Sequence, residues 1–252
     1  MAKVICLAQQ KGGTSKTSSV LNLSACLVQA GYKVLAVDVD QQASLTVSLG
    51  VDLSNLKRSM QALLTEQAVA AEEVIVKTEE GIDLIPANVD LAMVEFQMPS
   101  ISRERVLARK LHPLKDRYDF ILIDTPPSFA ITTLNAMVAA EYLLVPVQPE
   151  PLCLLGMSQL TKFFQLVQQD TNPHIRHLGV FIALYDGRSN YHKEITKQIR
   201  EDWGDLAFQT VIRRRMNILE ATLKGQATTT LAPNSEVAQD YQALTKEILA
   251  RV

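Results

Sequence analysis

Short runs of consecutive apolar residues alternate along the chain with longer stretches of mixed apolar and polar residues. The runs are rich in Val, Ile and Leu and predict strands buried on both faces, whereas the longer stretches predict helices. The predicted strands are residues 3–8, 33–40, 82–87, 119–124, 142–147 and 177–184. The predicted helices are residues 16–30, 88–97, 101–116, 129–140, 153–169, 190–203 and 236–251. This alternation predicts an α/β fold with a single doubly wound, mainly parallel sheet and helices on both faces. Because no long linker or repeat interrupts it, we expect one domain over residues 1–252.

Polar residues gather at three places where predicted strands end. Residues 9–18 follow the first strand, residues 38–44 close the second, and residues 124–128 follow the run FILID. In a parallel sheet, ligands bind beyond the carboxyl ends of the strands. We therefore expect the three clusters to meet at one crevice.

The first cluster is similar to a phosphate-binding loop but departs from its usual pattern, G-x-x-x-x-G-K-[ST]. The stretch reads AQQKGGTSKTSSV, residues 8–20. With Lys16 and Thr17 placed at the end of the pattern, Gln10 and Ser15 stand at its two glycine positions. The loop also carries a second lysine, whose purpose the pattern does not explain.

The glycine pair and the Lys-Thr pair still predict phosphate binding. Gly12 and Gly13 let the backbone turn its N–H groups toward an anion, and the N-terminus of the next helix adds partial positive charge. Lys16 can then reach the β- and γ-phosphates of a nucleotide, while the Thr17 hydroxyl binds Mg²⁺. A Gly-Gly turn before a capped helix is the structural alternative. The expected contacts of this loop are Gly12, Gly13, Thr14, Ser15, Lys16, Thr17 and Ser18.

Three aspartates after apolar strands are candidates for the metal and the hydrolytic step. Asp124 ends a strand, as does the aspartate that holds Mg²⁺ through water in P-loop NTPases. Of Asp38 and Asp40, one would contact the Mg²⁺ shell and the other would position a water for attack on the γ-phosphate. We assign Asp40 to catalysis and, with Thr17 and Asp124, to the metal; an Asx-type turn is the structural alternative.

Composition and charge narrow the class of protein. Hydrophobic residues make up 47% of the 252 residues, yet no apolar run reaches the roughly 18 to 20 residues of a bilayer span. The three cysteines are far apart in apolar surroundings, which predicts buried thiols in a cytoplasmic protein, and the four histidines are expected at the surface. The net charge is −2, but residues 188–224 hold eight Lys or Arg against five Asp or Glu. A local basic patch is compatible with these counts, whereas a basic protein is not.

Five segments in the same order resemble the ParA/Soj partition ATPases of the ParA–MinD group, whose variant Walker A loop reads KGGxxKT. The segments are residues 10–50, YDFILIDTPPS, VPVQPE, GVFIALYDGRS and the tail from Thr210, so the resemblance covers residues 3–250. It implies a deviant-Walker P-loop NTPase fold, ATP and Mg²⁺ as cofactors, and ATP hydrolysis that is weak unless a partner stimulates it. It also implies a homodimer on ATP binding, sequence-independent binding of double-stranded DNA, a ParB-type adaptor and a place on the nucleoid. The work implied is positioning of plasmid or chromosome DNA.

The resemblance also explains the second lysine of the loop. Lys11 matches the signature lysine of the family, which reaches across an ATP-sandwich dimer to the partner's nucleotide. Lys16 would then serve its own nucleotide and Lys11 the neighbour's. A second cation offsets the charge that develops during phosphoryl transfer, so both lysines are expected to be catalytic.

Four positions depart from the family. Ser15 replaces a glycine and Gln41 a proline, Arg213 replaces a proline near adenine, and Asn217 replaces an arginine implicated in DNA binding. By resemblance, the backbone at Ile212 and Arg213 contacts the base. Arg188 matches an arginine used for DNA, and the three arginines from 213 to 215 could make up for Asn217. The expected DNA contacts are Arg188, Arg213, Arg214, Arg215 and Lys224.

Other members of this group remain alternatives. A relative that positions a protein cargo would use the same chemistry with another partner. A MinD-type membrane ATPase would need a C-terminal helix rich in Lys and Arg, whereas residues 238–252 carry only Lys246 and Arg251, so we expect no membrane contact. A metabolic ligase with a related P-loop should lack Lys11 and the arginine-rich segment, and an electron carrier would need more cysteines.

Overall fold

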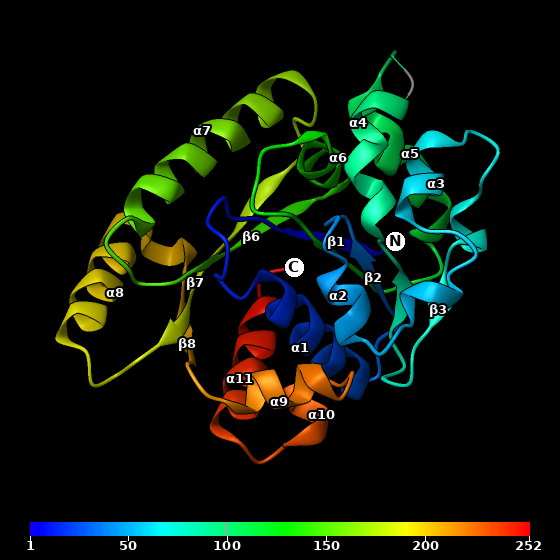
Figure 1. Ribbon diagram of the computed structural model, residues 1–252. Coiled ribbons are helices and arrows are strands. Elements are labelled where there is room, and N and C mark those ends of the chain that lie inside the picture. The colour runs from blue at the N-terminus through cyan, green and yellow to red at the C-terminus, as the bar shows by residue number, and fades with distance from the viewer. Residues whose placement is uncertain (99) are drawn as a thin grey trace.

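One eight-stranded sheet runs through the computed structural model, which describes residues 1–98 and 100–252 (Figure 1). The strands lie in the order β3-β4-β2-β5-β1-β6-β7-β8, and all pairs are parallel except β3 with β4. Their bounds are β1 (Lys3–Leu7), β2 (Val34–Asp38), β3 (Val76–Lys77), β4 (Asp83–Ile85), β5 (Phe120–Asp124), β6 (Tyr142–Val147), β7 (Arg176–Tyr185) and β8 (Ala207–Arg213). The predicted mainly parallel α/β sheet is confirmed.

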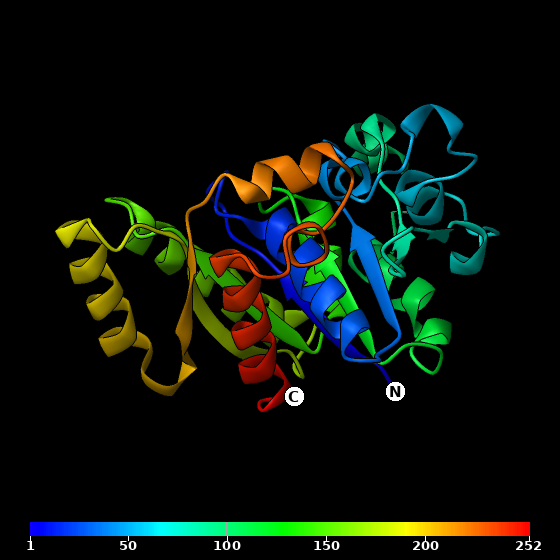
Figure 2. The same cartoon turned by 90° about the horizontal axis from the view of Figure 1, so that it is seen from below.

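Helices cover both faces of this sheet, as the view from below shows (Figure 2). The α-helices are α1 (Lys16–Gln29), α2 (Ser44–Ser48), α3 (Met60–Thr65), α4 (Val94–Gln97), α5 (Val106–Leu111), α6 (Ile131–Ala139), α7 (Cys153–Asp170), α8 (Asn190–Trp203), α9 (Asn217–Leu223), α10 (Thr228–Leu231) and α11 (Glu236–Leu249). Short 3-10 helices lie at Leu53–Asn55, Ala71–Glu73, Val89–Met93, Arg103–Arg105, His112–Leu114 and Gly204–Leu206. One core lies under α1, α2 and α11, and the other under α3 to α8.

The central strands show why their sequences are apolar throughout. In β1, Val4 and Cys6 point into one core while Ile5 and Leu7 point into the other, because successive side chains of a strand alternate between faces. The register then aligns the strand ends: Leu7 pairs with Asp124, and Asp124 pairs with Asp38. The loops after β1, β2 and β5 therefore start level, at one edge of the sheet.

The predicted helices are confirmed where the structure has one continuous long helix and wrong in detail where it has a series of short turns. Residues 190–203 form α8 over the predicted span, since Ser189 caps its first turn and Gly204 ends it. The predicted helices over residues 88–97 and 101–116 are broken into 3-10 and α-helical turns, and Pro113 lies just beyond α5. The elements β3, β8, α2, α3, α9 and α10 were not predicted from the residue pattern.

The cysteines and one histidine test the burial predictions. All three thiols are buried, as predicted. His177 is half-buried and not exposed as predicted: its ring lies 3.8 Å from that of Phe164 and 5.3 Å from that of Trp203, measured between centroids. Burial lowers the pKa of His177 to about 4. Within the described ranges, no helix is both long and apolar enough to span a bilayer.

Candidate nucleotide site

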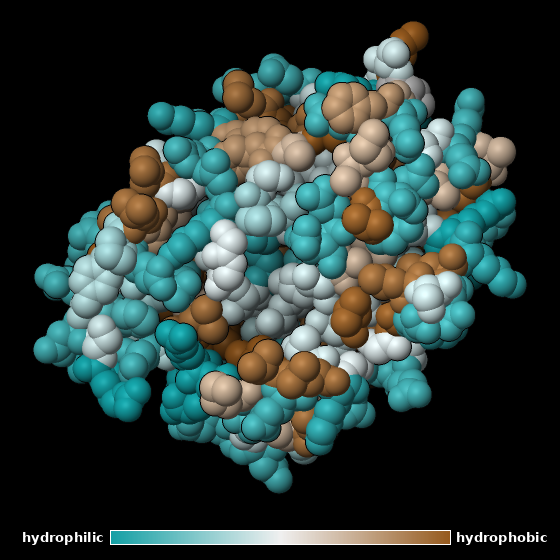
Figure 3. Space-filling view, viewed as in Figure 1, coloured by the Kyte–Doolittle hydropathy of each residue, from teal (hydrophilic) through white to brown (hydrophobic). Residues whose placement is uncertain are grey.

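A hollow of about 650 Å³ lies at the carboxyl ends of β1, β2 and β5, on the face shown in Figure 3. All seven predicted loop residues from Gly12 to Ser18 line it, together with Asp40 after β2 and Thr125 after β5. The three predicted polar clusters therefore do meet at one crevice. Arg214 and Arg215, which follow β8, complete the wall on the far side.

The loop between β1 and α1 has the backbone of an anion-binding turn. Gly13 has φ +74°, and nothing lies within 4 Å of where a Cβ would stand. Ser15 also adopts the left-handed conformation, with φ 66° and ψ 21°, directly before the first turn of α1. A serine there carries the backbone strain that the expected glycine would avoid.

Lys16 lies inside the hollow as a buried cation. Only 7% of the residue is exposed, and its Nζ donates to the carbonyl oxygen of Lys11 at 3.5 Å. Burial lowers the pKa of Lys16, while the charges of Asp124 and Asp40 oppose that shift. A phosphate beside this ammonium would stabilise its charged form in the same way.

Asp124 and Thr17 fit a hard cation such as Mg²⁺. The Thr17 hydroxyl donates to Asp124 Oδ2 at 2.6 Å, and the buried Asp124 Oδ1 has no hydrogen-bond partner. Burial raises the pKa of Asp124 well above its ordinary range, so a bound cation would favour the carboxylate. In the described chain no group of three or more His, Cys, Asp or Glu side chains could hold a metal. Mg²⁺ usually takes most of its ligands from water and phosphate, so this pair is sufficient.

The two aspartates after β2 have different places. Asp38 is fully buried and accepts hydrogen bonds from the backbone N–H and the hydroxyl of Thr46, at 2.9 and 2.8 Å. Burial raises its pKa to about 6. Asp40 lines the hollow. One of its carboxylate oxygens accepts a hydrogen bond from the N–H of Gln42 at 3.0 Å, so Asp40 also forms the Asx-type turn named above as the structural alternative. Asp38 therefore fixes α2 in place, and Asp40 is the one of the two aspartates that lines the hollow.

Lys11 does not line the hollow that its own loop forms. Its Nζ pairs with the carboxylate of Glu150, which lies in the loop before α7, and about a third of each side chain is exposed. Glu150 had no signal in the sequence, because the contact joins residues 139 positions apart. The two lysines of the loop therefore lie in different environments: Lys16 lines the hollow, and Lys11 pairs with Glu150.

Ile212 and Arg213 do not line the hollow with their side chains. Ile212 is fully buried, and the Arg213 guanidinium turns to Asp240 and Glu236 on α11. Any contact of these two residues with a base would have to come from the backbone. Sequence reasoning missed the apolar wall of the hollow, which is formed by Leu184, Ile218 and Leu219. Leu184 has φ 55°, an uncommon conformation for a residue with a branched side chain.

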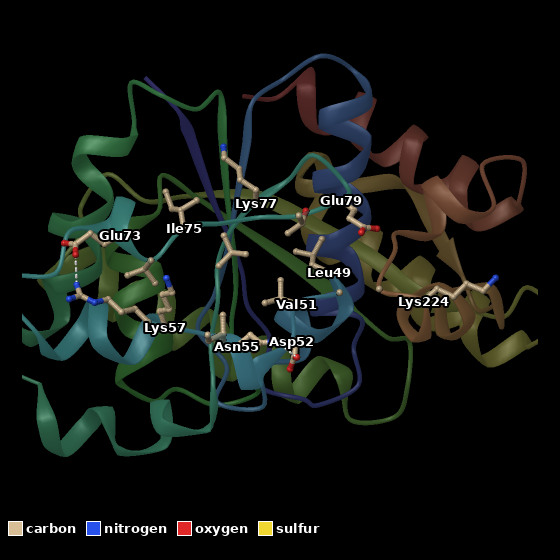
Figure 4. A pocket seen from close by; sticks show the side chains of 17 residues that line it. Leu49, Val51, Asp52, Asn55, Lys57, Glu73, Ile75, Lys77, Glu79 and Lys224 are labelled. Carbon is tan, nitrogen blue, oxygen red and sulfur yellow. Dashed lines mark hydrogen bonds and ion pairs between the residues drawn. The ribbon is translucent and has the colours of Figure 1, made fainter.

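The expected DNA contacts fall into separate groups. Arg188, Arg213 and Arg215 line a second hollow of about 720 Å³, and Arg214 lines the nucleotide hollow. Lys224 belongs to a third hollow of about 630 Å³ beside Leu49 and Lys77 (Figure 4). Lys224 is therefore not brought together with the three arginines of the second hollow.

Ser15→Gly is expected to stabilise the protein by up to about 1 kcal/mol. The left-handed conformation costs a residue with a side chain about 1–2 kcal/mol, part of which the greater freedom of an unfolded glycine cancels. Ser18→Gly, within α1, is the matched control and should destabilise by about 0.5 kcal/mol. Urea unfolding without nucleotide measures both changes, and equal losses in the two variants would contradict strain at Ser15.

Comparisons with known proteins agree with this geometry. Residues 2–177 match the model of the AAA domain family. The chain is 36% identical to the sporulation initiation inhibitor protein Soj of Bacillus subtilis, over 99% of both chains. It is 34% identical, with a TM-score of 0.86, to cobyrinic acid a,c-diamide synthase of Mycobacterium smegmatis with bound ATP analogue and magnesium, over 99% of this chain and 95% of that one. It is 30% identical, with a TM-score of 0.84, to the cell division ATPase MinD of Pyrococcus furiosus over 100% of both.

The family model spans well over half of the chain, and the Soj likeness spans nearly all of it. The solved structures share its fold along nearly the whole chain, with TM-scores of 0.84 and 0.86. The chain belongs to the ParA–MinD family of P-loop ATPases, the family of Soj and ParA.

Proposed function

We propose that the protein binds ATP with Mg²⁺, forms a homodimer on the nucleotide, hydrolyses it slowly, and binds double-stranded DNA without regard to sequence. Its work would be to position plasmid or chromosome DNA together with a ParB-type adaptor. The observation that carries the proposal is the separation of the two lysines. Lys16 lines the nucleotide hollow with Thr17 and Asp40, while Lys11 of the same loop is not part of its lining and pairs with Glu150.

Exposed apolar side chains on the same face support a dimer. Leu152 and Leu155 at the start of α7, and Met216, Leu219 and Leu223 in and before α9, are all more than half exposed. Figure 3 shows apolar side chains at both places, on either side of the hollow. A second copy facing the hollow would cover them and bring Lys11 toward the partner's nucleotide.

The arginines after β7 and β8 support DNA binding. The Arg188 side chain is 92% exposed. Arg215 lines both the second hollow, with Arg188 and Arg213, and the nucleotide hollow. Arginine contacts to phosphates are blind to sequence, and a dimer would present two such surfaces to one duplex.

Three other functions found among related ATPases have less support from the structure. A membrane role would need a free apolar face on α11, but Val237, Tyr241, Leu244 and Ile248 are buried in the core. A role as a metabolic ligase is suggested by the likeness to the cobyrinic acid synthase. Such a role would not require Lys11 or the arginines that follow β7 and β8. Positioning of a protein cargo would use the same ATP chemistry and remains the second candidate.

A mobility shift on unrelated duplexes tests the proposal, with ATP, ADP or no nucleotide across a salt series. Binding is expected with ATP alone, and to fall steeply as salt rises. Arg188→Glu should weaken binding and leave the mass of the ATP dimer unchanged. Arg117→Glu is the matched control, because Arg117 is also exposed but precedes β5, at the opposite edge of the sheet. Equal binding in all three nucleotide states would contradict a switch operated by ATP, and no binding even at low salt would favour a protein cargo.

A further inference from the structure

The arginines of the second hollow form ion pairs with carboxylates of the same chain, two of which belong to α11. It lies between the loop after β7, the end of β8 and α11, and three guanidinium groups reach it. The Arg188 guanidinium donates to both oxygens of Asp186, at 3.1 and 3.2 Å. We call the surface formed by Arg188, Arg213 and Arg215 the arginine hollow.

Two carboxylates of α11 occupy the other two arginines. Arg213 forms a two-point contact with Asp240, at 3.0 and 2.7 Å, and a further bond of 2.6 Å to Glu236 Oε1. Arg215 places its Nε and Nη2 at 2.7 and 2.6 Å from Glu236 Oε2. One glutamate is therefore shared by two arginines.

These ion pairs change the charge that the sequence predicts. Residues 188–224 carry a local excess of positive charge, but Glu236 and Asp240 lie outside that segment and fold back onto it. The three guanidinium groups of the arginine hollow pair with three carboxylates: Asp186 and Asp240 line the hollow, and Glu236 lies beside it on α11. The positive charge of the three arginines is therefore matched by an equal negative charge in this structure.

The three pairs differ in how easily a phosphate could replace the carboxylate. The side chains of Arg213 and Asp240 are 32% and 11% exposed, and Asp240 also accepts the backbone N–H of Arg213, so this pair is structural. Arg188 is almost fully exposed, where an ion pair contributes little, so Asp186 releases it readily. Arg215 and Glu236 are 45% and 50% exposed and lie between these limits. The hydrogen bond from Arg215 is the main cause that lowers the pKa of Glu236, so this carboxylate stays charged near neutral pH.

We propose that Glu236 is an internal competitor for nucleic-acid phosphate, holding Arg215 in the place where a phosphate oxygen would otherwise bind. Carboxylate and phosphate offer guanidinium the same paired acceptor geometry, so the two exclude each other on Arg215. The affinity of the arginine hollow for a polyanion is then set by Glu236 and not by the number of arginines alone. The inference rests on the proposed DNA binding, which it deepens.

Glu236→Gln tests it, with Glu95→Gln as the matched control. Both substitutions remove one negative charge, but Glu95 is exposed on α4 and forms no ion pair within the described residues. With a slowly hydrolysed ATP analogue, Glu236→Gln should tighten DNA binding up to about tenfold at 0.1 M salt. The plot of log affinity against log salt should steepen by about 0.9 for each hollow that contacts the duplex, because each freed arginine gains one phosphate. Glu95→Gln should stay within about twofold of the parent, as expected for a remote charge that salt screens.

Retention on heparin without nucleotide gives a readout that does not depend on DNA or on dimerisation. Glu236→Gln should elute at higher salt than both the parent and Glu95→Gln. Glu236→Asp keeps the charge but shortens the side chain, and it should elute between the parent and Glu236→Gln, which covers the case in which the glutamine variant folds poorly. Parent-like behaviour of Glu236→Gln on DNA and heparin, with the parent itself binding DNA, would overturn the inference and leave the proposed function standing. Absence of DNA binding by the parent together with the heparin shift would overturn the proposed function instead.

Discussion

Lys16→Ala is expected to abolish ATP binding at micromolar nucleotide. Lys16 is the buried cation of the hollow, and loss of one partner of a buried, hydrogen-bonded charge pair costs about 2–5 kcal/mol. That cost weakens binding roughly 30-fold to several thousand-fold. Isothermal titration with ATP and Mg²⁺ measures the change directly.

Lys11→Ala is the matched control, since it makes the same substitution five residues earlier in the same loop. Lys11 lies outside the hollow, so the monomer of this variant should bind ATP within about threefold of the parent. Equal losses in the two variants would mean that the lysines do not have separate roles. Unchanged affinity in Lys16→Ala would remove Lys16 from the site.

Lys11→Ala is also expected to prevent the ATP dimer and to lower hydrolysis by about 100- to 1,000-fold, the usual effect of removing one group that stabilises developing charge. In the monomer Lys11 is held by Glu150, but both side chains are about a third exposed. An ion pair of that kind contributes at most about 1 kcal/mol, so it does not prevent Lys11 from reaching a partner's phosphates.

Light scattering with a slowly hydrolysed ATP analogue, and phosphate release with ATP, measure the two effects of Lys11→Ala. Lys162→Ala, on the exposed side of α7, is the control for loss of a lysine and should behave as the parent. A Lys11→Ala protein that dimerises and hydrolyses normally would contradict the role across the subunits.

The sheet and the long helices could be predicted because their signals are local. A run such as VICL is apolar throughout since both of its faces are buried, and Ser189 and Gly204 mark the ends of α8 within the sequence itself. The short elements have no such signals. β3 has two residues, and only its pairing with β4 makes it a strand; α2 is shorter than two helical turns and is held by the contact of Thr46 with Asp38.

The features of the site also differ in whether the local sequence predicts them. The phosphate loop and Asp124 follow strands whose ends coincide, so a parallel sheet brings them together. The wall formed by Leu184, Ile218 and Leu219 and the pairing of Glu236 with Arg215 are products of the tertiary fold. A count of charges along residues 188–224 could not include carboxylates that return from α11.

Arg215 belongs to the walls of two hollows at once. If nucleotide in one hollow and DNA at the other both act on this side chain, the two binding equilibria are linked, and linkage is reciprocal. Whatever factor ATP adds to the affinity for DNA, DNA must add to the affinity for ATP. A molecule on DNA would then hold its nucleotide more tightly than one in free solution, so the DNA itself would act as a ligand that preserves the loaded state.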